Sequence, residues 1–343
     1  MNRWGPAQLV GTVLTSLILW AILAGACLLV GSTGVGWPTR DTFHFRLEMV
    51  LLASLVGAAL SAAGVAYQSI LRNPLAEPYL LGVSSGASLA AYLWRFPAIG
   101  AALISTLGPA AGAISQQALA FAGALAAVFV VFALASRRGR VEPVTLLLVG
   151  VIVNSINGSI YLLINALSKD MTGGSGGEIA FLVGVIQTNL EKSQVLAAAI
   201  VAGAGWLVLS YLSGQLNAAV LSEAEAEALG VRIHRLRWTA LIVASLMTAS
   251  AVAVSGPIGF VGLVAPHVAR LLVGHDQRKL LPVATALGAG LLALADAASR
   301  LLAMNALWRT VLPVGILTGL LGGPFFLFLL WQSRRRPAGG QPL

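Results

Sequence analysis

The chain has 343 residues, of which 58% are hydrophobic and 10% charged, with 38 glycines. This composition excludes a soluble globular domain and is typical of a membrane protein with many spans. The formal net charge of +9 could indicate nucleic-acid binding. The basic residues sort by side of the membrane once the spans are placed, so we expect no nucleic-acid partner.

Ten apolar runs are long enough to cross about 30 Å of hydrocarbon, which takes roughly 20 helical residues. They lie near residues 7–30, 47–71, 79–96, 112–135, 144–167, 194–213, 238–255, 257–274, 280–299 and 311–331. The first contains the single cysteine, Cys27, so no intrachain disulfide can form. Residues 23–27 loosely match a lipoprotein cleavage box, but we interpret this run as an uncleaved helix in a membrane-lipid environment.

The spans predict an all-α polytopic fold with about ten transmembrane helices in a single transmembrane domain, residues 1–343. An even count puts both termini on one side of the membrane. Clusters of arginine at 137–140 and 334–336 place that side in the cytoplasm, with a cytoplasmic tail at 332–343. Residues 170–189 begin as a Gly-rich linker and then hold an apolar run too short to span, so we expect a re-entrant or surface helix on the outer side.

Two stretches rich in glycine and proline interrupt the apolar pattern. The first is residues 72–86, RNPLAEPYLLGVSSG, and the second is residues 255–270, SGPIGFVGLVAPHVAR. The second break contains four helix-interrupting residues, Gly256, Pro257, Gly259 and Pro266. Irregular backbone persists in a membrane only where protein buries it or where it lines a cavity. Breaks in corresponding halves also indicate a transport pathway, and spans two to five and seven to ten would be oppositely oriented, as in an inverted repeat.

The only long soluble-looking segment is residues 216–237, LNAAVLSEAEAEALGVRIHRLR. Ser222 and Glu225 have the spacing of a capping box, and Glu223 and Glu227 add negative charge where a helix dipole favours it. Gly230 supplies a C-terminal stop. We therefore expect a cytoplasmic helix of about two turns, which is either a solvated loop or a docking surface for a cytoplasmic protein.

Enzyme signatures are missing from the sequence. None of the three lysines follows a glycine, so there is no GxxxxGK[ST] phosphate-binding loop, and any ATP must bind to another chain. The four histidines have no metal-ligand spacing, so we expect no metal site and no catalytic residue. For His267, which lies near Arg270, we expect a hydrogen-bonded structural role.

One acidic residue lies within a predicted span. Asp296 precedes Arg300 by four residues, so the two can pair on one helix face. We favour a structural ion pair, and the alternative is a proton relay in a secondary transporter. Arg46, Arg300 and Arg309 fall at outer span ends, where they face either lipid headgroups or an acidic partner.

Four blocks of sequence resemble the permease subunits of ABC importers for iron siderophores, haem and cobalamin, the FecCD family. They are RNPLAEPYLLGVSSGA at 72–87, EALGV at 227–231, GPIGFVGLVAPHVARLLVGHDQRKLLP at 256–282 and LPVGILTGLLGGPFFLFLL at 312–330. The resemblance implies a type II importer permease fold in the bacterial cytoplasmic membrane. It also implies a second permease chain, identical or paralogous, with one pathway at the dimer axis. The other implied partners are two ATPase subunits that bind ATP and magnesium, and a periplasmic or extracellular substrate-binding protein.

The resemblance also implies roles for individual residues. The ATPase-coupling helix would comprise Ser222, Glu223, Glu225, Ala226, Leu229 and Gly230. Asn73, Pro74 and Leu75 would belong to the cytoplasmic gate, and Arg46 and Arg300, joined by the nearby outer Arg309, would dock the binding protein. The chain departs from the family where many members read Arg-Leu-Pro-Arg, because it has Glu48 and Met49 after Arg46 and Leu47. Val311 also stands where many members carry a glutamate, and Pro143 and Val144 replace small hydroxyl residues of some relatives.

Overall fold

In the computed structural model, residues 6–31, 34–94, 96, 101, 105–106, 108, 115–137, 140–172, 183–186, 190–220, 223–303 and 312–335 are described. The helices are α1 (Pro6–Leu28), α2 (Arg40–Ile70), the 3-10 helix η1 (Pro78–Leu81), α3 (Val83–Leu93), α5 (Gln116–Ala135), α6 (Pro143–Thr172), α8 (Lys192–Ala219), α9 (Glu223–Ala228), α10 (Ile233–Ser255), α11 (Val261–Val273), α12 (Gln277–Ala303) and α13 (Val314–Arg335). Two short antiparallel ribbons join β1 (Val30–Gly31) to β2 (Gly34–Val35) and β3 (Ser136–Arg137) to β4 (Arg140–Val141), with Val30 opposite Val35 and Ser136 opposite Val141.

The predicted all-α membrane fold is confirmed, because each of the ten predicted spans coincides with a helix. Seven of the described helices are long and apolar enough to cross a membrane, and α11 and α13 add shorter apolar helices. The third span is split into η1 and α3 by Gly82, whose φ of 81° ends one helix and begins the next. The predicted surface helix at 170–189 lies largely outside the described residues, apart from the end of α6 and residues 183–186.

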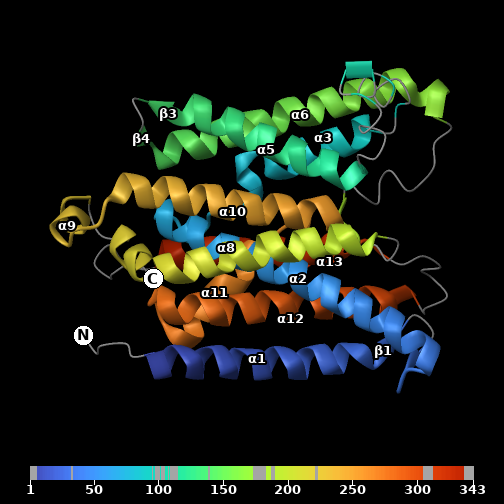
Figure 1. Ribbon diagram of the computed structural model, residues 1–343, viewed down its shortest axis with the longest axis horizontal. Coiled ribbons are helices and arrows are strands. Elements are labelled where there is room, and N and C mark those ends of the chain that lie inside the picture. The colour runs from blue at the N-terminus through green and yellow to red at the C-terminus, as the bar shows by residue number, and fades with distance from the viewer. Residues whose placement is uncertain are drawn as a thin grey trace.

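The long helices run side by side, with α6 at one edge of the view and α1 at the other (Figure 1). Helix α9 lies at one end of this bundle, and we call that end the α9 face (Figure 1). The first turn of α1 and the last turn of α13 lie at the same end (Figure 1). The helical termini therefore lie on one side, as the even number of predicted spans requires.

Helix α2 is the central element of the bundle. In its apolar window 83% of the residues are buried, against 17% for α1 and 11% for α6, so α2 is enclosed by protein while α1 and α6 face outwards. Two buried hydroxyl contacts fix α2 to its neighbours: the Tyr67 hydroxyl lies 2.7 Å from that of Ser245 on α10, and Ser61 donates to the Ala284 carbonyl of α12 over 2.6 Å.

Small residues allow α2 to approach other helices at backbone distance. A Cβ placed on Gly57 would lie 2.2 Å from the carbonyl oxygen of Gly288 on α12. One on Gly64 would lie 1.9 Å from the carbonyl oxygen of Gly262 on α11. Apolar burial does not draw helices together inside lipid, so close van der Waals contact of this kind is a main source of helix association there.

The two halves of the chain pack in the same order. Helix α3 contacts α5 and α6 in the first half, and α11 contacts α12 and α13 in the second. Helices α2 and α10 contact each other, and each also contacts the short helix that follows its partner. Each of these long helices thus packs against the short helix of the other half, which is the arrangement expected of an inverted repeat.

Replacing Gly64 with alanine should lower the stability of the bundle. The new methyl group would meet the Gly262 backbone, which cannot rotate away, so we expect a loss of about 1–3 kcal/mol in unfolding free energy. The measurement is thermal or denaturant unfolding of the purified protein in detergent. Gly11→Ala on α1 is the matched control, because its Cβ meets nothing within 4 Å, and an equal effect of both substitutions would contradict the prediction.

Candidate functional site

The two predicted breaks lie against each other inside the bundle. Helix α10 ends where Gly256 adopts φ 68° and ψ −176°, a conformation that is essentially restricted to glycine. The unwound backbone then donates twice to the first break: the Ile258 N–H donates to the Tyr79 hydroxyl over 2.8 Å, and the Phe260 N–H donates to the Glu77 carboxylate. Side chains of the first break thus satisfy backbone donors of the second, which lipid could not do.

The first break begins with a tight turn at the α9 face. Arg72 has φ 49°, a left-handed conformation that is uncommon outside glycine, and its Nε donates to the Ala219 carbonyl at the end of α8 over 2.8 Å. The Asn73 side chain accepts from the Leu75 N–H at 2.9 Å, which closes an Asx turn around the exposed Pro74. This turn, predicted as a gate, is therefore attached to the C-terminal end of α8.

Pro266 leaves one backbone carbonyl of α11 without its helical donor, and that carbonyl links α11 to α2. Proline has no N–H, so the carbonyl of Gly262, four residues earlier, loses its helical donor. That carbonyl instead accepts a long hydrogen bond of 3.4 Å from Nε2 of the buried Gln68, and Gln68 Oε1 accepts from Arg270 over 2.8 Å. A helix break predicted from Pro266 is thus repaired by polar side chains.

The second break is also braced by residues 183–186 and by the start of α13. The Val185 N–H donates to the Ser255 carbonyl over 2.8 Å, and the Gly315 N–H donates to the Gly184 carbonyl over 3.1 Å. A Cβ on Gly184 would lie 2.2 Å from the Pro257 carbonyl oxygen. Four separate parts of the chain therefore meet around Pro257.

The predicted short helix is present as α9, and it ends as predicted. Gly230 has φ 78°, its N–H donates to Glu227, and the Val231 N–H donates to Ala226 over 3.1 Å. These two bonds form a Schellman motif, in which a left-handed glycine closes the helix. Ser222 lies outside the described residues, so the capping box stays a prediction, and Glu223 is described only as the first residue of α9.

Helix α9 is packed against the bundle on one side and exposed on the other. Ala226 is fully buried, and α9 contacts α8 and α10. Glu225, Glu227 and the side chain of Leu229, 66% exposed, face outwards. Two grooves of about 390 and 400 Å³ flank the turn that follows, and both are lined by Gly230, Val231, Arg232 and Arg235. The outward side of α9 and of the turn after it thus presents one large apolar side chain between acidic and basic residues.

Two of the predicted outer arginines, Arg46 and Arg300, point inwards. Arg300 forms an ion pair of 2.6 Å with Asp296, and both side chains are only 3% exposed, which confirms the predicted pairing on one helix face. Arg46 is also buried, and its guanidinium donates to the carbonyls of Leu28 and Gly36 at 3.0 and 3.1 Å. Both guanidinium groups thus have partners within the chain. Arg309 lies outside the described residues, and docking by the three arginines stays a prediction.

Histidine chemistry is limited in this structure. Among the described residues no three His, Cys, Asp or Glu side chains gather as a metal site would require. The expected hydrogen bond of His267 is not seen at Nδ1, which is buried without a partner, and the ring packs edge-on against Phe325 at 5.7 Å. Partial burial and the nearby charge of Arg270 lower the pKa of His275 in the turn after α11, so this imidazole is neutral at pH 7.

The structure brings Glu77 and Tyr79 of the first break against the broken helix of α10 and α11, and it leaves the predicted gate turn beside the end of α8, and α9 at the end of the bundle. The residues that join the two breaks, Glu77, Tyr79 and Gln68, were not identified from the sequence. The available signal was Glu77, the one acidic residue of the first break, because such a residue needs a partner in a membrane.

Comparisons with known proteins cover nearly the whole chain. The model described as the FecCD transport family matches residues 38–332. The chain is 40% identical over 290 residues to the cobalamin import system permease protein BtuC of Halobacterium salinarum, which covers 83% of this chain and 72% of that protein. It is 35% identical over 356 residues to the hemin transport system permease protein HmuU of Yersinia pestis, with coverage of 98% and 99%. A solved chain from an inward-facing ABC transporter assigned to the metal-chelate type superimposes with a TM-score of 0.76 at 29% identity, over 94% of this chain and 99% of that chain.

Tyr79→Phe should loosen the contact between the two breaks. The substitution leaves the Ile258 N–H without its acceptor, and an unsatisfied buried donor costs about 1–3 kcal/mol of unfolding free energy. Unfolding in detergent measures this cost. Tyr211→Phe is the control, because Tyr211 is 82% exposed, and equal stability of the two variants would contradict the role given to Tyr79.

Arg300→Met should destabilise the protein by about 3–5 kcal/mol, because it leaves the Asp296 carboxylate buried without its partner. The double variant Asp296→Leu with Arg300→Met removes both charges and should recover most of that loss. Thermal unfolding of the single and double variants measures the coupling. If the loss in the double variant equalled the sum of the losses in Asp296→Leu alone and Arg300→Met alone, the ion pair would not be the reason for the cost.

Proposed function

Because the chain belongs to the FecCD transport family, we propose that it is the membrane-spanning subunit of an ATP-binding-cassette importer that carries a metal chelate inwards. Relatives named for cobalamin and for hemin support haem or cobalamin as cargo, and the family resemblance adds ferric siderophores. The sequence has no phosphate-binding loop, which is consistent with ATP and magnesium bound by two separate ATPase subunits. A second permease chain, identical to this one, would complete the pathway, and a binding protein would deliver the cargo.

The observation that carries this proposal is the geometry of α9. It is a short helix with a fixed C-terminal end, anchored through the buried Ala226, and it presents Leu229, Glu225 and Glu227 outwards. In the proposed assembly the α9 face is cytoplasmic, so both termini lie in the cytoplasm of a bacterial cell, and the ATPase binds over α9.

The packing around α9 offers a route from the ATPase to the pathway. Helix α9 contacts α8, whose last residue accepts from Arg72 of the gate turn, and α10, whose other end is the break at Gly256. A displacement of α9 would therefore reach both breaks through two rigid helices. Nucleotide binding would bias the switch between two packings of these breaks, with no bond of the cargo changed.

Arg46 and Arg300 require a further condition if they dock the binding protein. Both are buried and bonded within the isolated chain, so docking would have to draw them out or act through the surface above them. We propose the second route, since an extracted arginine would leave Asp296 unpaired.

A proton-coupled secondary transporter is the alternative, with Asp296 as the relay. The buried ion pair of 2.6 Å with Arg300 favours a structural role, because the carboxylate already has a partner within the chain. The two functions predict different energy sources, so one reconstitution distinguishes them.

The test is uptake into proteoliposomes that contain this chain with its ATPase and binding protein, supplied with a ferric siderophore, haemin or cobalamin. ATP-dependent accumulation of one cargo would support the proposal and identify the substrate. Uptake driven by a proton gradient without ATP, and abolished by Asp296→Asn, would overturn it.

Leu229→Ser should uncouple transport from ATP hydrolysis. The side chain is exposed, so folding should be unaffected, but a central apolar contact with the ATPase would be lost, and we expect ATP-dependent uptake to fall at least about tenfold while hydrolysis continues. Parallel uptake and phosphate-release assays measure the two rates. Leu14→Ser, at a similarly exposed site on the outward-facing helix α1, should leave both rates unchanged, and an unchanged Leu229→Ser variant would rule out α9 as the coupling contact.

A further inference from the structure

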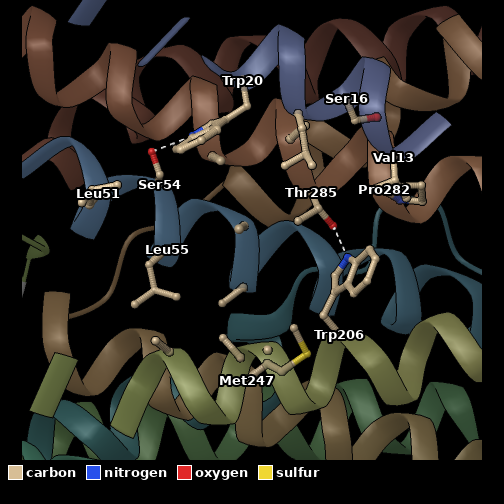
Figure 2. A pocket seen from close by; sticks show the side chains of 18 residues that line it. Val13, Ser16, Trp20, Leu51, Ser54, Leu55, Trp206, Met247, Pro282 and Thr285 are labelled. Carbon is tan, nitrogen blue, oxygen red and sulfur yellow. Dashed lines mark hydrogen bonds between the residues drawn. The ribbon is translucent and has the colours of Figure 1, made fainter. Parts of the chain in front are cut away.

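A cavity of about 490 Å³ lies between α1, α2, α8, α10 and α12, away from the two breaks. Its walls include Trp20 of α1, Leu55 of α2, Trp206 of α8, Met247 of α10 and Ala289 of α12 (Figure 2). The cavity therefore lies in the apolar part of the bundle, between helices from both halves of the chain.

The lining offers almost no free polar group. The Trp20 indole N–H donates to Ser54 over 2.9 Å, and that of Trp206 donates to Thr285 over 3.1 Å (Figure 2). Thr285 and Ser16 in turn donate to backbone carbonyls. Water needs two to four polar partners to occupy a cavity, so this cavity selects hydrocarbon instead.

The cavity opens sideways towards lipid rather than into the protein. Leu17 of α1 and Leu51 of α2 belong to its lining, yet they are 51% and 47% exposed. The outer surfaces beside it are apolar as well, as at Ile200 and Leu207 of α8, 61% and 65% exposed. A hydrocarbon chain can thus enter directly from the bilayer.

A basic residue lies at the α9 end of α12, close to α8. Arg278 lies on α12 one turn before Pro282, which lines the cavity, and four residues of helix rise only about 6 Å. Its guanidinium lies against α8, where a Cβ on Gly214 would be 2.9 Å from it. Arg278 is exposed, and no carboxylate in the described part of the chain forms an ion pair with it.

We propose that this cavity binds one acyl chain of an anionic phospholipid from the leaflet on the α9 side, with the lipid phosphate held by Arg278. A basic residue at the headgroup level beside an apolar crevice between helices is the arrangement that recognises such lipids. The lipid fills the space between α1 and α8 and stabilises the contact of α1 with the bundle.

The main experiment is native mass spectrometry of the full-length, delipidated protein titrated with phosphatidylglycerol and with phosphatidylcholine of the same acyl chains. Wild-type protein should bind one phosphatidylglycerol per chain and prefer it about fivefold, as expected for one arginine near the headgroup. Gly203→Leu fills the cavity, because Gly203 lines it and a Cβ there meets nothing within 4 Å, and should lower affinity for both lipids at least about tenfold.

Matched controls separate the cavity from general effects. Gly25→Leu adds the same side chain on α1 at a position that also meets nothing within 4 Å but does not line the cavity, and it should bind like wild type. Arg278→Gln should abolish the preference for phosphatidylglycerol and leave phosphatidylcholine binding unchanged. Arg40→Gln, at the opposite end of the bundle, should retain the preference.

A second measurement does not depend on the folding of the Gly203 variant. In phosphatidylcholine vesicles with a small fraction of phosphatidylglycerol brominated at mid-chain, part of the tryptophan emission should be quenched. Trp206→Phe should remove more of that quenching than Trp37→Phe does. Trp206 lines the cavity, whereas Trp37 is 89% exposed and lies outside the helices. The proposal would be overturned if Gly203→Leu left the lipid affinity unchanged or altered only the oligomer mass. It would also be overturned if Arg278→Gln kept the preference for phosphatidylglycerol, or if Trp206→Phe and Trp37→Phe lost equal amounts of quenching.

Discussion

Every unwound backbone group within a membrane must find a hydrogen-bond partner inside the protein, and this constraint organises the molecule. The chain unwinds in two places, and side chains of the first satisfy backbone donors of the second: Tyr79 and Glu77 accept from Ile258 and Phe260. Gln68 repairs the gap that Pro266 leaves in α11. The two breaks can exist only as a pair, so the halves of the bundle must meet at this position.

Close helix packing is what allows the pair to form. Glycines at 57 and 64 let α2 touch the backbones of α12 and α11, which brings the second break within reach of side chains that follow α2. The same dependence makes the region able to switch. A few polar contacts and glycine approaches hold the breaks, and rigid helices connect them to α9, so a small displacement at the α9 face can be passed to the centre of the bundle.

The few charged side chains lie in two kinds of environment, buried within the bundle or exposed at the α9 face. Inside the bundle Asp296 and Arg300 neutralise each other, and Arg46 is satisfied by carbonyls, so these groups stabilise the end opposite α9. At the α9 face the charges of Glu227 and Arg278 are exposed, where they are available to a protein or a lipid headgroup. The distinction follows from solvation, because a buried charge without a partner is costly and an exposed one is not.

The sequence by itself determined the ten spans, the positions of both breaks, the stop of α9 at Gly230 and the pairing of Asp296 with Arg300. All of these depend on residues near one another in the chain: apolar length, glycine and proline, and a spacing of four. Only the tertiary structure decided that the breaks meet, that Arg46 and Arg300 turn inwards, that His267 lacks a partner at Nδ1, and that five helices enclose an apolar cavity. Those contacts join residues far apart in sequence, such as Tyr79 and Ile258, and depend on how closely the helices pack, which local patterns do not encode.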